Sequence, residues 1–587
     1  MTKKLTILIC IVILGFILRF WQINQIPPGL NRDEASIGYT AFSILKTGRD
    51  EYGNFLPISF KSFGDWKLPG YIYLTIPSIT LFGLNENSVR LSAIILASLT
   101  TINVFFLASI LIIREDGQDF RIKKFIPYLA ALFFAISPWS IHLSRNASEA
   151  SSSIFFITSG LIIYLNSSNL FKKIIGTILL LVPMYTYHGN HIFIPLLYTG
   201  LFLFFWKRDK SIKNLVSIFI FLLGAILIYS QTLHIADKTK ISGLLITNDS
   251  YTIHEFIDLS RLEHKTTFFA QLLHNKLLFF IIEVFNNYIR GFSPEFLFIT
   301  GGDNIQHNIP DFGNLYLWDA PFLLVGIYFV LTNKFKYKKI ILWWLVISPV
   351  AASITRDAPH TNRMASFIPL PQIFIAIGTV FFLYHFLKNY KYYISIFPIV
   401  IISALLFVNV AIWADRYFIH FPVKREASWG GGYKDLVSQV QSQKDQYKEI
   451  LIDRPEYSPY IYFLFYEKSD PAIFQKEVIR YPTESSGFQH VKSFSNLTFK
   501  KLNWADDLVI PNRLLISWAD NTPPSATNSS LLMDKLTLKN VQNKFGQTYG
   551  LAIGDRVYAT LKDTIYLQNG HPQFYIIEIN KKSIYGK

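Results

Sequence analysis

Residues 88–113 read SVRLSAIILASLTTINVFFLASILII and contain a single charged side chain, Arg90. About 20 mainly apolar residues in a helix are enough to cross the hydrocarbon part of a bilayer, so this stretch predicts a transmembrane helix. The whole chain has the same character, because 51% of its 587 residues are apolar and 16% are charged. Soluble proteins carry about 25% charged residues. The composition therefore argues against a water-soluble enzyme and against a disordered chain.

About eleven segments of this kind are predicted to span a membrane. They cover residues 5–22, 88–113, 125–141, 150–166, 174–187, 192–206, 214–230, 320–332, 340–354, 366–387 and 394–413. Two more apolar stretches, 71–82 and 277–290, are shorter or interrupted, and we expect them to lie in the membrane interface. The predicted fold class is a polytopic α-helical membrane protein.

The placement of basic residues predicts the orientation of these spans. Eighteen lysines and arginines fall at the amino terminus or in alternate loops. They are Lys3, Lys4, Arg114, Arg121, Lys123, Lys124, Lys172, Lys173, Lys207, Arg208, Lys210, Lys213, Lys334, Lys336, Lys338, Lys339, Lys388 and Lys391. The short loops between them contain three arginines. By the positive-inside rule the amino terminus is cytoplasmic and residues 23–87, 231–319 and 414–587 are outside. The net charge of +16 thus reflects orientation, and no nucleic-acid partner is expected.

The first segment has a basic start and an apolar core, as a signal peptide does. It is followed by Arg19-Phe20-Trp21 in place of a small-residue cleavage site, which predicts an uncleaved anchor. The single cysteine, Cys10, lies inside this segment. The external parts of the protein are therefore expected to have neither a disulfide nor a cysteine-based metal site.

The chain changes character after residue 413. Gly430-Gly431-Gly432 precedes a helix-like stretch at 433–447. Short β-like runs follow at 449–453, 460–466, 508–518, 556–567 and 573–579. We predict two domains: a transmembrane domain over 1–413, with interfacial helices in the outer loop 23–87, and an external α+β domain over 414–587 of ordinary domain size.

The first outer loop holds the densest group of external charges. Asp33-Glu34 begins a predicted amphipathic helix that ends near Lys46-Thr47, with Gly48 as its C-terminal cap. These acids either cap the helix and favour its dipole, or supply a general base at the membrane surface. Further on, Asp65 and Lys67 precede the apolar stretch 71–82. Lys67 either extends its charge to the interface or serves as a point charge for a phosphate.

Later outer loops add six more candidates. Arg145 and Glu149 are four residues apart and either form a helical ion pair or contribute to a site. His188 and His191 could ligate a metal, although no third ligand is specified. Sugar or head-group hydrogen bonding and a structural role are the other readings of these histidines. Arg356 and Arg363 complete the set listed here: Arg145, Glu149, His188, His191, Arg356 and Arg363.

An arginine at the start of a span, such as Arg363, is costly unless it pairs or binds an anion such as a phosphate. No glycine-rich phosphate loop, nucleophile elbow or kinase motif is present in the sequence. An enzyme with this topology would therefore need a membrane lipid as its activated substrate.

The outer-loop Asp33-Glu34, the acid and lysine at 65–67, and Phe-Gly-Leu-Asn-Glu-Asn-Ser-Val-Arg-Leu at 82–91 resemble the GT-C membrane glycosyltransferases. Within them the chain is similar to the group of protein O-mannosyltransferases and bacterial lipid A aminoarabinose transferases. The resemblance implies that Asp33 is the catalytic aspartate with Glu34 as its companion. It also implies that Lys67 holds the lipid phosphate. The chain reads Lys67-Leu68-Pro69-Gly70 where the family has a Lys-Pro-Pro motif.

The resemblance implies an inverting transfer of a sugar from a polyprenyl-phosphate carrier to an acceptor hydroxyl on a protein, lipid or wall polymer. The charge of the lipid phosphate would be held by Lys67 and by one or more of Arg145, Arg356 and Arg363. The residues expected to bind the substrate or its lipid phosphate are Asp65, Lys67, Arg145, Glu149, His188, His191, Arg356 and Arg363. A divalent metal ion held by Asp33, Glu34 and Asp65 is left open. The expected location is the plasma (inner) membrane of a prokaryote, with the active site and the carboxyl-terminal domain outside.

Two other functions remain open from the sequence. A transporter or lipid flippase would place charges near the bilayer midplane or break its spans at matching positions in two halves. A non-catalytic envelope protein would use its tail to bind a partner. The clustering of charge at one face and the acid-rich first loop favour the transferase.

Overall fold

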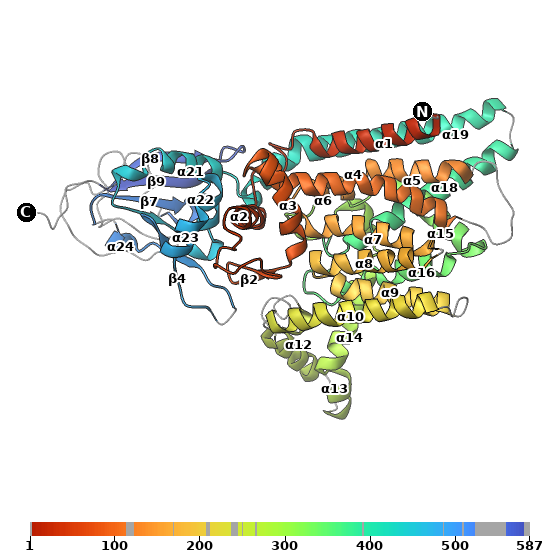
Figure 1. Cartoon of the computed structure of the whole chain (residues 1–587), viewed down its shortest axis with the longest axis horizontal. Helices are drawn as coiled ribbons and strands as arrows, with labels where there is room; N and C mark the ends of the chain where they lie inside the picture. Colours follow the sequence, from red (N-terminus) through yellow and green to blue (C-terminus); the bar gives the residue numbers. More distant parts are fainter. Residues whose placement is uncertain are drawn as a thin grey trace, which may run out of the picture. The chain divides into compact units, whose positions relative to one another are not determined.

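The computed structural model describes residues 3–112, 123–167, 169–206, 212–235, 245–248, 250–263, 267–389, 392–484, 487–507, 510–522 and 559–579 (Figure 1). Several basic residues used for the orientation lie outside this described part, namely Arg114, Arg121, Lys207, Arg208, Lys210 and Lys391. Contacts divide the chain into two compact units. The helical unit comprises Met1–Ile23, Leu68–Leu74 and Arg90–His420, and the mixed unit comprises Asn24–Lys67, Thr75–Val89 and Phe421–Lys587.

The first outer loop thus belongs to the same compact unit as the carboxyl-terminal region. The predicted boundary near residue 413 lies close to His420, where the chain passes from the helical unit into the mixed unit. The division into a membrane domain over 1–413 and an external domain over 414–587 stays a prediction.

The helical unit is a bundle of apolar helices, joined in places by short 3-10 or π turns. Its helices are α1 (Lys3–Phe20), α5 (Ile126–Ala135), α6 (Pro138–Ser144), α7 (Glu149–Leu165), α8 (Leu170–Thr186), α9 (Asn190–Trp206), α10 (Ile212–Ile235), α12 (Ser250–Glu263), α13 (Thr267–Leu273), α14 (Lys276–Arg290), α15 (Asp319–Thr332), α16 (Lys338–Ile347), α17 (Val350–Ser353), α18 (Pro369–Asn389) and α19 (Tyr392–Asp415). Two more helices, α3 (Pro69–Phe82) and α4 (Glu86–Leu111), have residues in both units.

Four helical segments in the described part of the chain are long and apolar enough to cross a membrane. They are Glu86–Leu111, Ile212–Gln231, Ala365–His385 and Phe397–Trp429. A fifth results if Lys123–Ala135 and Pro138–Ser144, which meet at an angle of 51°, form one span. Shorter apolar helices occupy three other predicted spans. The predicted helical membrane architecture is confirmed, and the number of eleven spans stays a prediction.

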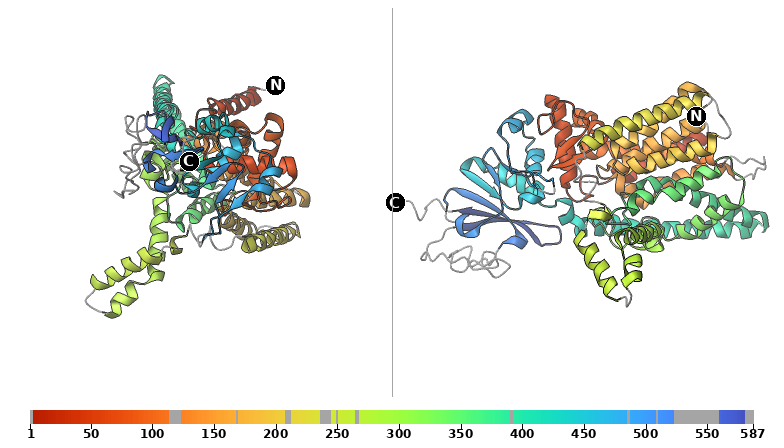
Figure 2. Two further views of the ribbon diagram at one scale, coloured as in Figure 1. Left: turned by 90° about the vertical axis from the view of Figure 1, so that its left-hand side faces the viewer. Right: turned by 90° about the horizontal axis from the view of Figure 1, so that it is seen from below.

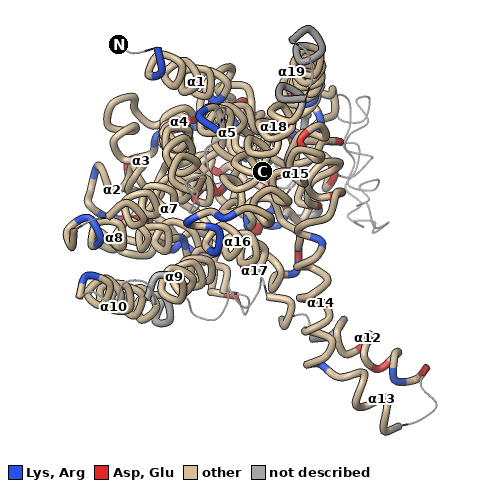
Figure 3. Tube along the Cα trace, turned by 90° about the vertical axis from the view of Figure 1, so that its right-hand side faces the viewer, with Lys and Arg blue, Asp and Glu red and all other residues tan. Residues whose placement is uncertain are grey.

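Basic residues gather at one end of the helical unit. Figure 3 looks onto the end at which α1 begins, and Lys and Arg lie there at α1, α5, α8, α10 and α16. The orientation that the positive-inside rule gives stays a prediction.

The core of the helical unit lies between α15 and α18 and between α7 and α8, which are its most closely packed helix pairs. Two buried tryptophan side chains hydrogen-bond to the backbone of segments between the helices. Trp344 Nε1 donates to Ser366 O at 2.9 Å, and Trp139 Nε1 donates to Thr361 O at 3.1 Å. Buried tryptophan side chains contribute a large apolar area to a core, and their N–H groups usually form a hydrogen bond.

An arm of three helices, α12, α13 and α14, projects from the helical unit (Figures 1 and 2). Its apolar side chains are largely exposed, as at Leu262 (81%), Leu277 (70%) and Phe268 (69%). The helix α14 covers the stretch 277–290 that the sequence assigns to the membrane interface. The exposed apolar surface fits that assignment.

The mixed unit combines a seven-stranded sheet with short helices. The strand order is β4-β5-β6-β3-β7-β9-β8, and the central strands β6, β3 and β7 are parallel. The strands are β3 (Glu449–Ile452), β4 (Ile479–Arg480), β5 (Val491–Phe494), β6 (Leu497–Phe499), β7 (Arg513–Trp518), β8 (Ala559–Tyr566) and β9 (Pro572–Ile579). The helices are α2 (Arg32–Thr47), α20 (Phe421–Arg425), α21 (Tyr433–Gln441), α22 (Tyr460–Tyr466), α23 (Pro471–Glu477) and α24 (Trp504–Asp507).

The predicted carboxyl-terminal α+β sheet region is confirmed, with one error in its elements. The run 460–466, predicted as a strand, forms the helix α22. The residues from Tyr460 to Phe465 are all aromatic or aliphatic, and all their side chains are buried. A continuous short apolar run does not distinguish a buried strand from a buried helix.

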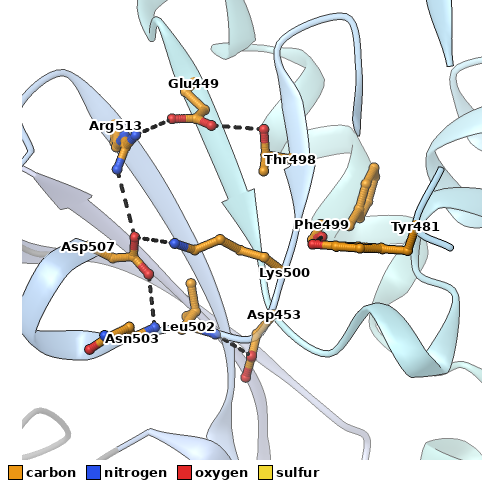
Figure 4. Close-up of polar contacts among 10 residues, drawn as sticks. All are labelled: Glu449, Asp453, Tyr481, Thr498, Phe499, Lys500, Leu502, Asn503, Asp507 and Arg513. Carbon is orange, nitrogen blue, oxygen red and sulfur yellow. Dashed lines mark hydrogen bonds and ion pairs between the residues drawn. The ribbon is translucent and has the colours of Figure 1, made fainter. Parts of the chain in front are cut away.

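The parallel strands are linked by a network of charged side chains (Figure 4). Arg513 Nη2 lies 2.6 Å from Glu449 Oε2, and Arg513 Nη1 lies 3.7 Å from Asp507 Oδ1. Lys500 donates to Asp507 at 2.6 Å, and Thr498 donates to Glu449 at 2.8 Å. Because these pairs connect β6, β3 and β7 with α24, they fix the centre of the sheet.

Candidate functional site

The helix α2 carries the first two candidate residues. Its N-cap, Asn31, accepts from Glu34 N, and Glu34 Oε2 in turn accepts from Asn31 N at 3.2 Å. This reciprocal pair is a capping box. The helix ends at Gly48, which has a left-handed backbone (φ +69°). The predicted helix and both of its ends are confirmed, and the capping reading holds for Glu34.

Asp33 and Lys67 form the central ion pair of the candidate site. Lys67 Nζ donates to Asp33 Oδ1 at 2.5 Å. The side chain of Lys67 is 5% exposed, whereas that of Asp33 is 56% exposed. Both residues belong to the mixed unit. They are 34 residues apart in the sequence, and the fold brings them into direct contact.

A two-stranded hairpin positions Lys67 next to Asp33. Strand β1 (Phe60–Ser62) pairs with β2 (Asp65–Lys67), with Phe60 opposite Lys67. The turn at Phe63-Gly64 has positive φ angles of 56° and 86°. Gln489 N donates to Phe63 O at 2.8 Å, so the turn is fastened to the loop that precedes β5.

Aromatic packing holds the cations of this region. Arg32 Cζ lies 5.6 Å and Lys67 Nζ lies 5.5 Å from the centroid of the Phe63 ring. Such positions allow cation–π attraction. Phe63 also contacts Tyr460 of α22, with ring centroids 6.1 Å apart. The helix α2 itself packs against α22 and α23, so elements from both ends of the sequence build the surroundings of Asp33 and Lys67.

A carboxylate that the sequence reasoning missed lies in the same unit. Asp50-Glu51 follows the C-cap of α2 and repeats the Asp-Glu pair that begins it. Glu51 is 1% exposed, and its Oε1 accepts from Tyr460 Oη at 3.0 Å. The signal that could have found it is the repeated acidic pair within one outer loop.

Arg145 lies in the helical unit and is fully buried. Its Nη1 donates to Leu18 O at 2.9 Å and to Arg19 O at 3.0 Å, at the end of α1. Its guanidinium also lies 5.6 Å from the ring centroid of Tyr417. This geometry satisfies the last carbonyls of a helix. It supports a structural role for Arg145 more directly than a phosphate-binding one.

Glu149 begins α7, whereas Arg145 ends α6. The two residues therefore do not share a helix, and the reading as an ion pair within one helix is wrong. The turn between the helices breaks the periodicity on which that reading depends. Ser148 in this turn donates to Asn362 at 3.1 Å, so the second outer loop meets the loop that carries Arg363.

Arg363 forms polar contacts inside its own loop. Its Nη1 donates to Thr355 Oγ1 at 2.6 Å, and its Nη2 lies 3.1 Å from Asp357 Oδ2. The pairing alternative that the sequence analysis raised for Arg363 is thus present. Arg356, seven residues earlier, is exposed. Whether these arginines bind a lipid phosphate stays a prediction.

The two histidines of the third outer loop lie side by side. The ring centroids of His188 and His191 are 5.7 Å apart. A ring nitrogen of His191 hydrogen-bonds to Met184 O at 2.7 Å. This bond to the preceding helix favours the structural reading of His191.

The first loop does not fit a divalent metal well. Asp33 Oδ1 is held by an ammonium and Glu34 Oε2 by a helix N-cap, whereas a divalent ion prefers several oxygens with no competing cation. Asp65 begins β2, and its side chain lies outside the described part of the structure. Among the described residues, no group of three or more His, Cys, Asp or Glu side chains could hold a metal ion.

Comparisons with known proteins give matches among solved structures. No family model matches the chain, and no curated protein sequence does. The archaeal oligosaccharyltransferase AglB from Archaeoglobus fulgidus, in complex with an inhibitory peptide and a dolichol-phosphate, has a TM-score of 0.48 and 14% identity over 79% of this chain. ArnT from Cupriavidus metallidurans, bound to undecaprenyl phosphate, has a TM-score of 0.47 and 10% identity over 98% of this chain. The arabinofuranosyltransferase AftD from Mycobacteria has a TM-score of 0.38 and 12% identity over 99% of this chain.

The match spans different shares of these proteins: 63% of AglB, 97% of ArnT and 40% of AftD. Two of the three are named as transferases of sugar groups. With identities of 14% or less and TM-scores below 0.5, these matches assign no role to any residue of this chain.

Proposed function

We propose that the protein is an integral-membrane glycosyltransferase that moves a sugar from a polyprenyl-phosphate carrier to an acceptor hydroxyl, with inversion at the anomeric carbon. The single observation that carries the proposal is the Lys67–Asp33 pair at 2.5 Å. It combines a buried ammonium, suited to an anionic leaving group, with an exposed carboxylate, suited to a proton from an incoming hydroxyl.

Asp33 acts as the general base. Its exposed carboxylate at the first turn of α2 accepts the proton of the acceptor hydroxyl while the oxygen attacks the anomeric carbon. A positioned base of this kind contributes about 10²- to 10⁴-fold to a rate. Glu34 fixes the helix end on which Asp33 lies.

Lys67 stabilises the departing polyprenyl phosphate, because a fixed charge aimed at a developing negative charge lowers the barrier. In the resting protein Lys67 is engaged by Asp33. When the lipid phosphate pairs with Lys67, the Asp33 carboxylate loses its ion-pair partner. The proton affinity of Asp33 then rises. One ammonium therefore couples leaving-group departure to activation of the base.

The proposal places the protein in the plasma (inner) membrane of a prokaryote. The amino terminus is then cytoplasmic, and Asp33, Lys67 and the region 414–587 are outside, as the distribution of basic residues favours. The acceptor is a protein, a lipid or a wall polymer, and the mixed unit that holds Asp33 is the part of the chain suited to choosing among them.

The test compares cells that lack the protein with cells that express the wild type, Asp33→Asn or Asp445→Asn. Asp445 is an exposed acid of the mixed unit and serves as the matched control. We expect mass spectrometry of envelope glycans and glycoproteins to show one sugar that depends on the wild type and on the control but is lost with Asp33→Asn.

Full sugar transfer by Asp33→Asn would overturn the assignment of the base. A flippase gives a different result, because it would move the lipid-linked sugar across reconstituted vesicles without releasing polyprenyl phosphate. Release of polyprenyl phosphate by the purified protein therefore separates the transferase from the transporter alternative.

A further inference from the structure

The acidic pair at the end of α2 contains two carboxyls with different surroundings. Asp50 is fully buried and accepts from Tyr52 N and Asn54 N, each at 2.9 Å. Asp50 therefore hydrogen-bonds to the backbone of its own turn, as aspartate side chains commonly do. Glu51 is equally buried, at 1% exposure, but its contacts come from distant parts of the chain.

Only one oxygen of Glu51 is engaged. Oε1 accepts from Tyr460 Oη at 3.0 Å, and the backbone oxygen of Glu51 accepts from Arg480 Nη2 at 3.0 Å. Among the described residues, Glu51 Oε2 has no hydrogen-bond partner. A buried polar atom without a partner is rare, and it is costly when it carries charge.

Charged and titratable groups from several elements interact electrostatically with this carboxyl. They are Tyr39 of α2, Asp50 and Tyr52 of the following turn, Lys61 of β1, Lys67 of β2, Tyr460 of α22 and Arg480 of β4. Burial raises the pKa of Glu51 to about 7, against the lowering effect of Arg480 and Lys67. The carboxyl therefore changes its charge near neutral pH, and Lys67 is one of the charges to which it responds.

We propose that Glu51 is a positioning residue of the donor site, which takes up a proton when the lipid phosphate binds to Lys67. Neutral Glu51 leaves the charge of Lys67 to the phosphate and to Asp33, whereas ionised Glu51 competes with them for it. The inference rests on the proposed function, in which Lys67 binds the phosphate of the donor.

The direction of the coupling follows from charge. A phosphate at Lys67 adds a negative charge near Glu51 and neutralises a cation that favours the Glu51 anion. Both changes favour the protonated carboxyl. By linkage, a ligand whose binding promotes protonation binds more weakly once the pH rises above the pKa of the free site.

The contacts from Tyr460 and Arg480 keep Glu51 in place in both charge states. The Tyr460 hydroxyl donates to Oε1, whichever form the carboxyl takes. Arg480 lies over the ring of Tyr52 at 4.1 Å while it holds the backbone of Glu51. The outer loop and the carboxyl-terminal region therefore fix the carboxyl together.

The experiment uses the full-length protein in nanodiscs and undecaprenyl methyl phosphate as the probe. This phosphodiester keeps one negative charge from pH 5.5 to 8.5, so its own titration does not interfere. We expect the wild type to bind it several-fold more weakly at pH 8.5 than at pH 6.5, up to about tenfold. Glu51→Gln, which keeps an acceptor for Tyr460 but cannot ionise, should bind with no such pH dependence.

Two controls separate the outcomes. Glu477→Gln, an exposed carboxyl-to-amide change in the same unit, should keep the wild-type pH dependence. The same pH dependence in the wild type and Glu51→Gln would overturn the inference and leave the proposed function standing. Binding that is absent throughout, or that survives Lys67→Ala unchanged, would overturn the proposed function itself.

A second measurement does not depend on the folding of a variant. Calorimetric titration of the wild type with the probe at pH 7, in two buffers of different ionisation enthalpy, reports the protons exchanged on binding. We expect uptake of a fraction of one proton. Zero exchange at pH 7 and at pH 7.5 would overturn the inference.

Discussion

Lys67 Nζ lies 2.5 Å from Asp33 Oδ1, and the buried member of this pair is the cation. Lysine is almost never buried unless it is paired, so the carboxylate is what allows the ammonium to lie at 5% exposure. A surface ion pair of this length would contribute little to stability. In the proposed function, the buried ammonium exchanges this carboxylate for the phosphate of the lipid donor.

Replacement of Asp33 by asparagine should reduce transfer by about 10²- to 10⁴-fold, because the proton of the acceptor loses its base. The measurement is release of polyprenyl phosphate from a lipid-linked sugar by the purified protein. Asp445→Asn should be as active as the wild type. Equal loss in both variants would show that the defect is not specific to Asp33.

Replacement of Lys67 by glutamine should raise the KM for the lipid donor and lower kcat, since in the proposed function the lysine contacts the phosphate before and during its departure. Lys67→Arg should not restore full activity, because a planar guanidinium does not fit where a compact ammonium is buried. Steady-state kinetics with the donor varied would measure both effects. An unchanged donor KM in Lys67→Gln would contradict the role of Lys67.

Replacement of Gly64 by alanine should destabilise the protein by at least about 2 kcal/mol and reduce transfer. A Cβ at Gly64 would lie 2.4 Å from Gln489 N and Gly487 O, both backbone atoms. The matched control is Gly570→Ala, which has a similar φ of +81° and nothing within 4 Å. It should cost about 1 kcal/mol through strain alone. Thermal unfolding of both variants measures the difference, and equal losses would refute the anchoring of the hairpin.

The stability of the protein should fall between pH 5 and pH 8 relative to Glu51→Gln. The pKa of Glu51 rises on folding from 4.5 to about 7, so the folded protein keeps a proton that the unfolded chain loses. The stability gained from the neutral carboxyl is complete below pH 4.5 and is lost as the pH rises through 7. Melting temperatures across this range measure it, and parallel curves for the two proteins would contradict the burial of an ionisable Glu51.

Replacement of Arg145 by alanine should lower the yield of folded protein, because it removes two hydrogen bonds of about 1.5–3 kcal/mol each from a charged donor. Arg356→Ala changes an exposed arginine and should leave stability unchanged. Size-exclusion chromatography in detergent and thermal unfolding measure both. A stable Arg145→Ala protein that has lost only donor binding would restore Arg145 to the phosphate site.

The sequence was sufficient for features that depend on local chemistry. The helix α2 was predicted from the acidic pair Asp33-Glu34 near its start and from Gly48 at its end, which are recognisable locally. Asp33 and Lys67 were identified because external charges are few. That they touch was not predictable, since it depends on the β1–β2 hairpin and on its attachment to residues near Gln489.

Features that depend on distant partners were beyond local reasoning. The repeated acidic pair could have drawn attention to Glu51, but its burial was not predictable, because it depends on Tyr460, which lies 409 residues further on. The contacts of Arg145 with the end of α1 were likewise not predictable, because a sequence does not distinguish an arginine that faces a ligand from one that caps a neighbouring helix. Its phosphate-binding role stays a prediction. The strand assigned to 460–466 failed for a related reason, because its apolar side chains are buried on every side.

The packing of α22 against α2 has a consequence for synthesis of the protein. Tyr39 Oη donates to Ser469 O at 3.2 Å, across 430 residues of sequence. At 5 to 20 residues per second, the ribosome needs roughly 20 to 90 s to make the intervening chain. During that interval the first outer loop has none of its carboxyl-terminal partners. The surroundings of Asp33 are therefore completed only after the helices of the helical unit have been made.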